Sequence, residues 1–181
     1  AYSESHNSII TLSDSTQGTS ISLFTMVNNQ NGRGGHSSLL IHASERVIFD
    51  PAGRVRLEIS REKMDVLYGI NDEVEKFYLS IHARVSHHVV KQTIFVSPAT
   101  AERALNLAIK NGPVAPALCA RAVSTLLQKV PGFEGITITY FPEKLMAEFA
   151  LIDGVKSENL FEYDDKDKSK AIRELEQQLK N

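Results

Sequence analysis

Cysteine is nearly absent from this chain, which has one, Cys119, among 181 residues. A single cysteine excludes an internal disulfide framework and any zinc site built from several cysteines. The thiol is therefore either a packed core side chain or a nucleophile. Six histidines accompany it and are candidates for the base that a nucleophilic thiol requires.

Long hydrophobic runs and an excess of charge of one sign are also missing. No apolar run approaches the roughly 18 residues that a membrane span requires, so no integral membrane span is expected. The net charge of −2 offers no basic excess for a phosphate backbone, and nucleic acid is not expected as a partner. The amino end, AYSESHNS, lacks the regions of a signal peptide. The compartment stays open, because a cleaved leader would allow the periplasm or cell envelope, and without one the cytoplasm is expected.

The length fits one domain, because domains commonly hold about 100 to 200 residues. Residues 1–20, rich in small polar side chains around SIITL, are expected to be an entry segment with one short strand. Residues 21–155 are expected to form the domain, and residues 156–181 a charged tail that is mobile or helical. The oligomeric state stays open.

Periodicity and turn residues predict the elements of this domain. Two helices are strongly indicated, over 98–111 between Ser97 and Gly112, and over 119–130 beginning at Cys119. A buried strand is expected over 19–29, a hairpin over 36–50 and a further strand over 77–96. The remaining predictions are a short helix near 71–77, a strand within 131–141 and a helix over 142–150.

The position of Cys119 favours a reactive thiol. Unpaired backbone N–H groups and the helix dipole at a helix N-terminus favour the thiolate, and the same N–H groups can stabilise an oxyanion. The alternative is an ordinary core helix, since free cysteine is among the most buried residue types.

His36 and Asp50 are the candidates for a base and for the residue that orients it. His36 opens a strand beside Gly34 and Gly35, which leave space for a substrate to approach. Asp50 has matching strand parity, so its side chain can face His36. A turn across Ser44, Glu45 and Arg46 places Asp50 opposite Leu40, about 13 Å from His36, unless a bulge or twist closes the gap. The alternatives are a surface histidine and a turn-forming Asp-Pro pair.

The order of these motifs resembles a known superfamily. The stretches GGHSSLLI, a following strand with a polar end, and CARAVSTLL are similar to those of the circularly permuted papain-like cysteine enzymes. This group includes permuted NlpC-type cell-wall peptidases and the lecithin–retinol acyltransferase group, in which the histidine strand precedes the cysteine helix. The resemblance covers roughly residues 20–150. It implies an α+β fold in which an antiparallel sheet packs on helices and the cysteine lies at a helix N-terminus.

The resemblance also implies a chemistry. It assigns Cys119 as nucleophile, His36 as general base and Asp50 as the orienting residue, in a thiol hydrolase or acyltransferase that needs no cofactor. The expected substrate is an amide or ester, in a cell-wall peptide or a lipid acyl group. The alternative is a non-catalytic domain that binds a peptide or a lipid in the same cleft.

The other histidines suggest a substrate wall rather than a metal site. On the predicted strand 77–96, His82 and Arg84 share one face and are candidate substrate-binding residues together with Gly34 and Gly35. A solvated strand face is the alternative. His87 and His88 would point to opposite faces, so they cannot chelate one ion, and no metal is expected.

Overall fold

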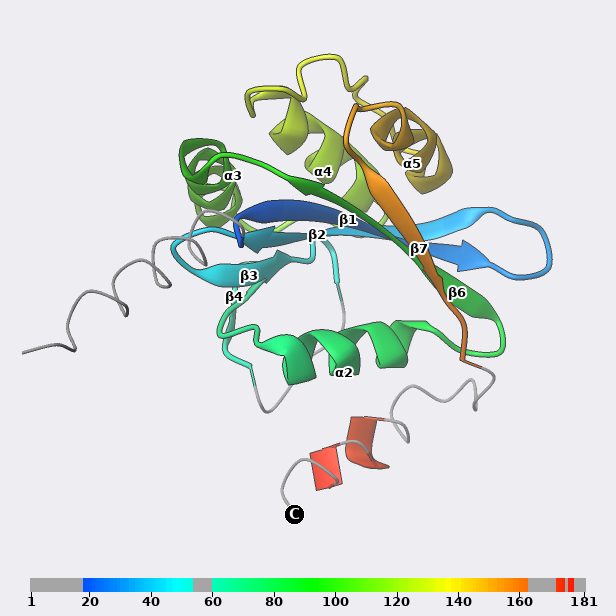
Figure 1. Cartoon of the computed structure of the whole chain (residues 1–181). Helices are drawn as coiled ribbons and strands as arrows, with labels where there is room; N and C mark the ends of the chain where they lie inside the picture. The colour runs from blue at the N-terminus through cyan, green and yellow to red at the C-terminus, as the bar shows by residue number, and fades with distance from the viewer. Residues whose placement is uncertain (1–17, 54–59, 163–171, 175, 178–181) are drawn as a thin grey trace, which may run out of the picture.

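The fold is α+β and is built on one antiparallel sheet (Figure 1). A computed structural model describes residues 18–53, 60–162, 172–174, 176 and 177. Seven strands lie in the order β4-β5-β3-β2-β1-β6-β7, and every neighbouring pair is antiparallel. The strands are β1 (Ser20–Asn28), β2 (Gly34–His42), β3 (Arg46–Phe49), β4 (Glu62–Lys63), β5 (Val66–Leu67), β6 (His87–Phe95) and β7 (Lys156–Leu160).

Helices cover both faces of the sheet. Helices α3 (Pro98–Asn111), α4 (Cys119–Gln128) and α5 (Pro142–Ala150) lie on one face, and α2 (Asp72–His82) lies on the other (Figure 1). Alternate residues of the central strands divide between two apolar clusters, one on each face. Leu39 and Ile41 of β2 belong to the cluster of α3, α4 and α5, whereas Leu40 belongs to the cluster of α2. The central strands are therefore buried on both sides.

The two helices most strongly indicated by the sequence are confirmed. The Ser97 hydroxyl accepts a hydrogen bond from the Thr100 N–H and caps α3, and Gly112, with φ 75°, ends that helix. Helix α4 begins at Cys119 as expected. Helix α5 covers the predicted range 142–150 and begins at a proline, whose missing N–H costs nothing in a first turn.

The strand predicted over 77–96 is partly wrong, because residues up to His82 are helical. Asn71 accepts a hydrogen bond from the Val74 N–H, and acidic residues occupy the first turn of α2, where they complement the helix dipole. Buried Val74, Phe77 and Tyr78 follow the helical period. The strand begins only at His87, as β6.

The strand predicted within 131–141 is also wrong. The alternation in GITITYF resembles a strand, but in the structure the segment is turns and irregular backbone. Side chains from neighbouring helices bond its backbone instead of a strand partner. Gln128 donates to the Ile136 carbonyl, the Ser124 hydroxyl accepts from the Thr139 N–H, and Glu148 accepts from the Thr137 N–H. These contacts satisfy the backbone without a sheet neighbour.

The predicted register of the hairpin was off by two residues. In the structure His42 pairs with Arg46 and Leu39 with Phe49, across a turn of three residues, Ala43 to Glu45. Continued by one residue, this register places Asp50 beside Ser38, two positions from His36 and on the same face. The gap of about 13 Å expected between Asp50 and His36 is therefore not present.

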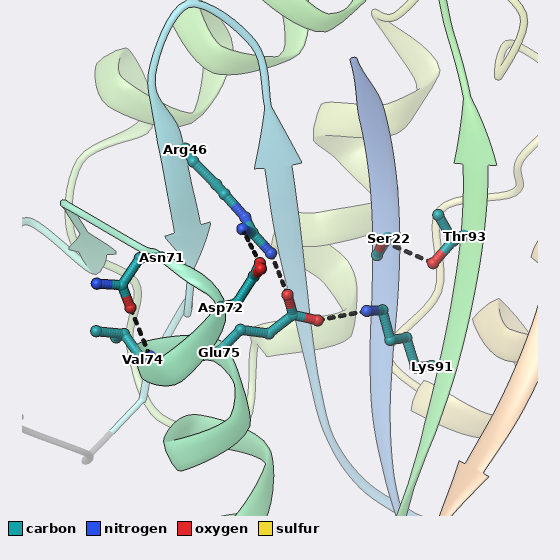
Figure 2. A network of polar contacts seen from close by, with 8 residues as sticks. All are labelled: Ser22, Arg46, Asn71, Asp72, Val74, Glu75, Lys91 and Thr93. Carbon is teal, nitrogen blue, oxygen red and sulfur yellow. Dashed lines mark hydrogen bonds and ion pairs between the residues drawn. The ribbon is translucent and has the colours of Figure 1, made fainter. Parts of the chain in front are cut away.

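A polar network ties α2 to the sheet (Figure 2). The buried carboxylate of Glu75 accepts from Arg46 of β3 and from Lys91 of β6, and Arg46 also donates to Asp72 at 2.6 Å. Nearby, the hydroxyls of Ser22 and Thr93 lie 2.8 Å apart and link β1 to β6. Because the charges come from two strands and one helix, they set the position of α2 across the sheet.

Some predictions fall on the chain ends. The short strand expected around residues 8–12 lies outside the described residues. Within the segment expected as a charged tail, residues 156–160 form the edge strand β7 against β6. None of the helices that the structure describes is long and apolar enough to cross a membrane.

Candidate functional site

The site lies where β2 continues beyond the end of β3. Residues 39–42 of β2 pair with β3, whereas among the described strands residues 34–38 pair only with β1. The edge of β2 at residues 34–38 is therefore not covered by β3. Helix α4 packs on the face of the sheet opposite to the His36 side chain, and its N-terminus reaches His36 across this uncovered edge. Cys119, His36 and Asp50 meet across this open edge, so the structure brings the three predicted residues together.

Cys119 is the first residue of α4 and is 7% exposed. Burial by itself would raise the pKa of the thiol. A hydrogen bond from His36, the positive charge of that ring, and the backbone N–H groups of Ser37 and Ala120 all act in the opposite direction. They outweigh burial, so the pKa of Cys119 is below its ordinary value of 9.0. Leu118 supplies no side-chain cap to α4, so no capping side chain occupies the first-turn N–H groups of this helix.

His36 lies between an acid and the thiol. Its Nε2 atom is 2.6 Å from Oδ1 of Asp50, and its side chain also hydrogen-bonds Cys119, for which Nδ1 remains. Burial would lower the pKa of the ring, but the hydrogen bonds and negative charges of Asp50 and Cys119 raise it to about 9. The imidazolium form of His36 and the thiolate form of Cys119 therefore stabilise each other.

Asp50 begins a turn and also bonds His36 through its carboxylate. Its carbonyl accepts from the Gly53 N–H at 2.9 Å, and Ala52 has φ 59°, so Asp50 begins a tight turn. Its carboxylate, 4% exposed, bonds His36. Burial would raise the pKa of this carboxyl, but the hydrogen bond and charge of His36 outweigh burial and lower it. Asp50 is therefore an anion at neutral pH.

Tyr78 is a site residue that sequence reasoning missed. Its buried hydroxyl lies 2.9 Å from Oδ1 of Asp50 and 2.9 Å from the Ser38 hydroxyl. Burial and the nearby charge of Asp50 raise the pKa of Tyr78 well above its ordinary value, so it stays protonated and able to donate. The helical period of residues 74–81 was the signal that could have placed Tyr78 on the inner face of a helix.

The two predicted substrate-binding glycines lie at a bulge in β2. Met26 pairs with His36 and Val27 with Gly34, so Gly35 is the extra residue. A Cβ on Gly34 would lie 2.6 Å from Cβ of Pro142 and 2.7 Å from the Glu143 nitrogen. Gly34 thus permits β2 to approach the start of α5, and its N–H donates to Glu143 at 3.1 Å.

A cleft of about 470 Å³ opens at Cys119. Gly34 and Gly35 form part of its wall. The rest of the wall comes from the β1–β2 turn, the approach to α4 and the start of α5. These residues are Arg33, Ala117, Tyr140, Phe141, Pro142 and Glu143. The cleft therefore offers one cation, one anion and two exposed aromatic side chains beside the thiol.

His82 and Arg84 do not form the predicted substrate wall. His82 ends α2 and is 5% exposed, and Arg84 is 3% exposed, so both are buried and neither lines the cleft. The assignment failed because it assumed a strand, in which the two side chains would share an open face. His82 instead lies within the site, where its ring stacks on that of His36 at a centroid distance of 6.2 Å.

The remaining described histidines are His42, His87 and His88, and His87 lies close to Gly35, because a Cβ on Gly35 would be 3.5 Å from Nε2 of His87. His42 is at the far end of β2, and His88 bonds Asn29 and stacks on Phe161. Within residues 18–53, 60–162 and the short described pieces beyond, no group of three or more His, Cys, Asp or Glu side chains is placed to hold a metal ion.

Comparisons with models of protein families, with curated proteins and with solved structures found no match to this chain.

Proposed function

We propose that this chain is a thiol hydrolase or acyltransferase with a circularly permuted papain-like fold, in which Cys119 is the nucleophile, His36 the base and Asp50 the orienting residue. The observation that carries the proposal is the continuous hydrogen-bonded series from Asp50 through His36 to Cys119, which ends at a helix N-terminus and opens on a cleft. The order of the elements, with the histidine strand before the cysteine helix, supports the permuted fold.

The first half of the proposed reaction forms an acyl-enzyme. The Cys119 thiolate attacks the carbonyl carbon of an amide or ester, a C–S bond forms, and the carbonyl π electrons move to oxygen. Backbone N–H groups in the first turn of α4 stabilise that oxyanion. When the tetrahedral intermediate collapses, the C–N or C–O bond breaks, and the leaving group takes a proton from the His36 imidazolium.

The second half releases the acyl group. Neutral His36 takes a proton from water, or from an acceptor hydroxyl or amine, whose oxygen or nitrogen attacks the thioester carbon. The C–S bond then breaks, and the thiolate and imidazolium are restored. Asp50 holds the ring with Nε2 toward itself and Nδ1 toward the sulfur, and its charge stabilises the imidazolium in both halves.

The cleft supports a substrate with both apolar and polar parts. Tyr140 and Phe141 are more than half exposed, whereas Arg33 and Glu143 provide charge on the same wall. A small peptide and a lipid-like acyl ester both fit this description. No cofactor enters the proposed reaction.

The proposal is tested by trapping the acyl-enzyme. The full chain is incubated with p-nitrophenyl esters of increasing chain length and with aminoacyl and dipeptidyl p-nitroanilides, and intact mass and chromophore release are followed. We expect an adduct on Cys119 and a burst of chromophore in the parent, and neither in Cys119→Ala. Separately, iodoacetamide labelling across pH is expected to show a thiolate well below pH 8.5. A thiol that reacts with an ordinary pH dependence and forms no adduct would support the non-catalytic binding domain instead.

A further inference from the structure

Two side chains of α2 contact the Asp50–His36 pair from behind. Tyr78 and His82 are four residues apart on the helix, so they lie on one face, one above the other. Their rings are 4.4 Å apart, and Nδ1 of His82 lies 2.8 Å from the Tyr78 carbonyl oxygen. The helix thus presents a phenol and an imidazole as one packed unit.

The phenol contacts the acid directly. The Tyr78 hydroxyl lies 2.9 Å from Oδ1 of Asp50, the same oxygen that bonds Nε2 of His36 at 2.6 Å. A carboxylate oxygen that accepts two hydrogen bonds has little freedom to rotate away from either donor. Because Tyr78 is completely buried, water does not compete for this bond.

The imidazole of His82 supports the base. Its ring and that of His36 are nearly parallel, 10° apart, with a centroid distance of 6.2 Å. His82 is buried against Tyr78 and helps to fill the space beside the His36 ring. The ring of His36 is therefore confined on one side by His82, while its two nitrogens are held by Asp50 and Cys119.

We propose that Tyr78 and His82 are positioning residues, through which α2 holds Asp50 and His36 in the orientation that activates Cys119. Tyr78 acts through its hydrogen bond to Asp50, and His82 acts through ring packing on His36. Neither residue lines the cleft, so neither is expected to touch substrate. The effect of these residues on catalysis rests on the proposed function. Their effect on the orientation of Asp50 and His36 does not depend on it.

The main test is Tyr78→Phe, which removes one hydroxyl and keeps the ring. Without that donor, the Asp50 carboxylate binds a proton more readily, and a neutral Asp50 no longer stabilises the imidazolium. In a plot of the rate of Cys119 alkylation by iodoacetamide against pH, the low-pH part of the curve, its acid limb, should therefore move to higher pH. Labelling at pH 5 should slow by roughly fivefold to tenfold. The titratable groups that act on the Asp50–His36 pair are Cys119, His82 and Tyr78, and the variant removes only the Tyr78 hydroxyl.

Ser38→Ala is the matched control. It removes the other partner of the same tyrosine hydroxyl, also at 2.9 Å, without removing the bond from Tyr78 to Asp50. We expect its alkylation profile to match the parent even if its melting temperature falls. If Tyr78→Phe lowers the melting temperature and leaves the acid limb unchanged, Tyr78 is only a structural residue and the inference is overturned.

His82 is tested independently by a pair of variants. His82→Phe keeps a flat ring beside His36, whereas His82→Ala leaves a space. Both remove the imidazole, so a difference between them reports packing alone. We expect the plateau rate of alkylation to stay within about twofold of the parent in His82→Phe and to fall about fivefold or more in His82→Ala. Equal rates in the two variants would refute the role given to His82.

Failure of the inference can be distinguished from failure of the proposed function. The titration of His36, followed by NMR of the ring in parent and Tyr78→Phe, requires no substrate. If no acyl-enzyme forms in the parent but Tyr78→Phe still shifts that titration and the acid limb, the positioning role stands and the hydrolase proposal falls. If the parent forms an acyl-enzyme, but Tyr78→Phe changes neither the His36 titration nor the acid limb, the hydrolase proposal stands and the positioning role falls.

Discussion

The carboxylate of Asp50 occupies the space that a side chain on Gly53 would need. A Cβ at residue 53 would lie 1.9 Å from Oδ2 and 2.3 Å from Cγ of Asp50. Atoms cannot approach this closely, so the turn at residues 50–53 holds the acid in place only with glycine at its last position. The glycine at residue 53 thereby contributes to the orientation of His36, because it leaves room for the Asp50 carboxylate that bonds the ring.

Gly53→Ala should therefore displace the Asp50 carboxylate from His36. We expect Cys119 alkylation near neutral pH to slow by roughly tenfold, because overpacking of this kind costs about 1 to 3 kcal/mol and 1.36 kcal/mol corresponds to a factor of ten. The control is Gly135→Ala, since an added Cβ at Gly135 meets no atom within 4 Å. A rate equal to that of the parent in Gly53→Ala would show that the acid does not depend on this turn.

Asp50→Asn separates the turn role of this residue from its charge. Asparagine also forms turns, so the melting temperature should change only modestly. The variant cannot stabilise the imidazolium as a charge, and it favours the wrong ring tautomer, so kcat should fall by a factor of ten or more. Asp72→Asn is the control, because Asp72 is an exposed carboxylate bonded to Arg46 and distant from the thiol. Full turnover in Asp50→Asn would remove Asp50 from the site and leave Cys119 and His36 in place.

The raised pKa of His36 predicts a distinct titration. By NMR, the ring should lose its proton at a pH of about 9 in the folded parent, compared with 6.5 for an unperturbed histidine. Cys119→Ala should lower this midpoint, because the negative partner of the imidazolium is removed. Turnover should fall as the pH rises through about 9, since the imidazolium then no longer supplies a proton to the leaving group. A midpoint near 6.5 in the parent would contradict the ion pair.

The same shift has a consequence for stability. A group whose pKa is higher in the folded than in the unfolded state stabilises the fold fully below its unfolded value, and loses that contribution as the pH rises through its folded value. The stability difference between the parent and His36→Gln, measured by urea unfolding, should thus be larger at pH 6 than at pH 10. A difference that is independent of pH would mean that the ring is not charged in the folded protein.

Glu75 should be important for stability without being part of the site. Glu75→Gln removes the anion that Arg46 and Lys91 share, which leaves two cations partly buried beside each other. We expect a loss of about 2 kcal/mol or more in the free energy of unfolding, measured with urea. Glu73→Gln, an exposed residue of the same helix turn, is the control and should change stability by less than about 0.5 kcal/mol. Equal losses in the two variants would show that the network in Figure 2 contributes no more than an exposed charge.

Several elements were predictable from local patterns. The helix that begins at Pro98 was indicated by its serine cap, its first proline and Gly112 after its last residue. Each of these signals acts on the helix turn next to it. The helix that begins at Cys119 was indicated by the helical spacing of its apolar residues, and α5 by the proline at its start. Parity alone indicated that His36 and Asp50 share a face, even though the predicted register was wrong.

Other features depended on partners far away in the chain. Residues 77–82 contain enough aromatic and β-branched side chains to suggest a strand, but packing of their helical face on the sheet decides for α2. Residues 136–141 alternate like a strand, yet Gln128, Ser124 and Glu148 satisfy their backbone.

By itself, the sequence determined the single thiol, its place at a helix N-terminus and a histidine at the start of a strand, because these depend on residue type and local conformation. Only the tertiary structure decided that β3 ends early enough to open the edge of β2, and that the register places Asp50 beside Ser38. It also decided that Tyr78 reaches Asp50 from α2. These contacts join residues that are from 14 to more than 80 positions apart in the chain, and their geometry is set by strand pairing and by packing between layers. No local pattern carries that information.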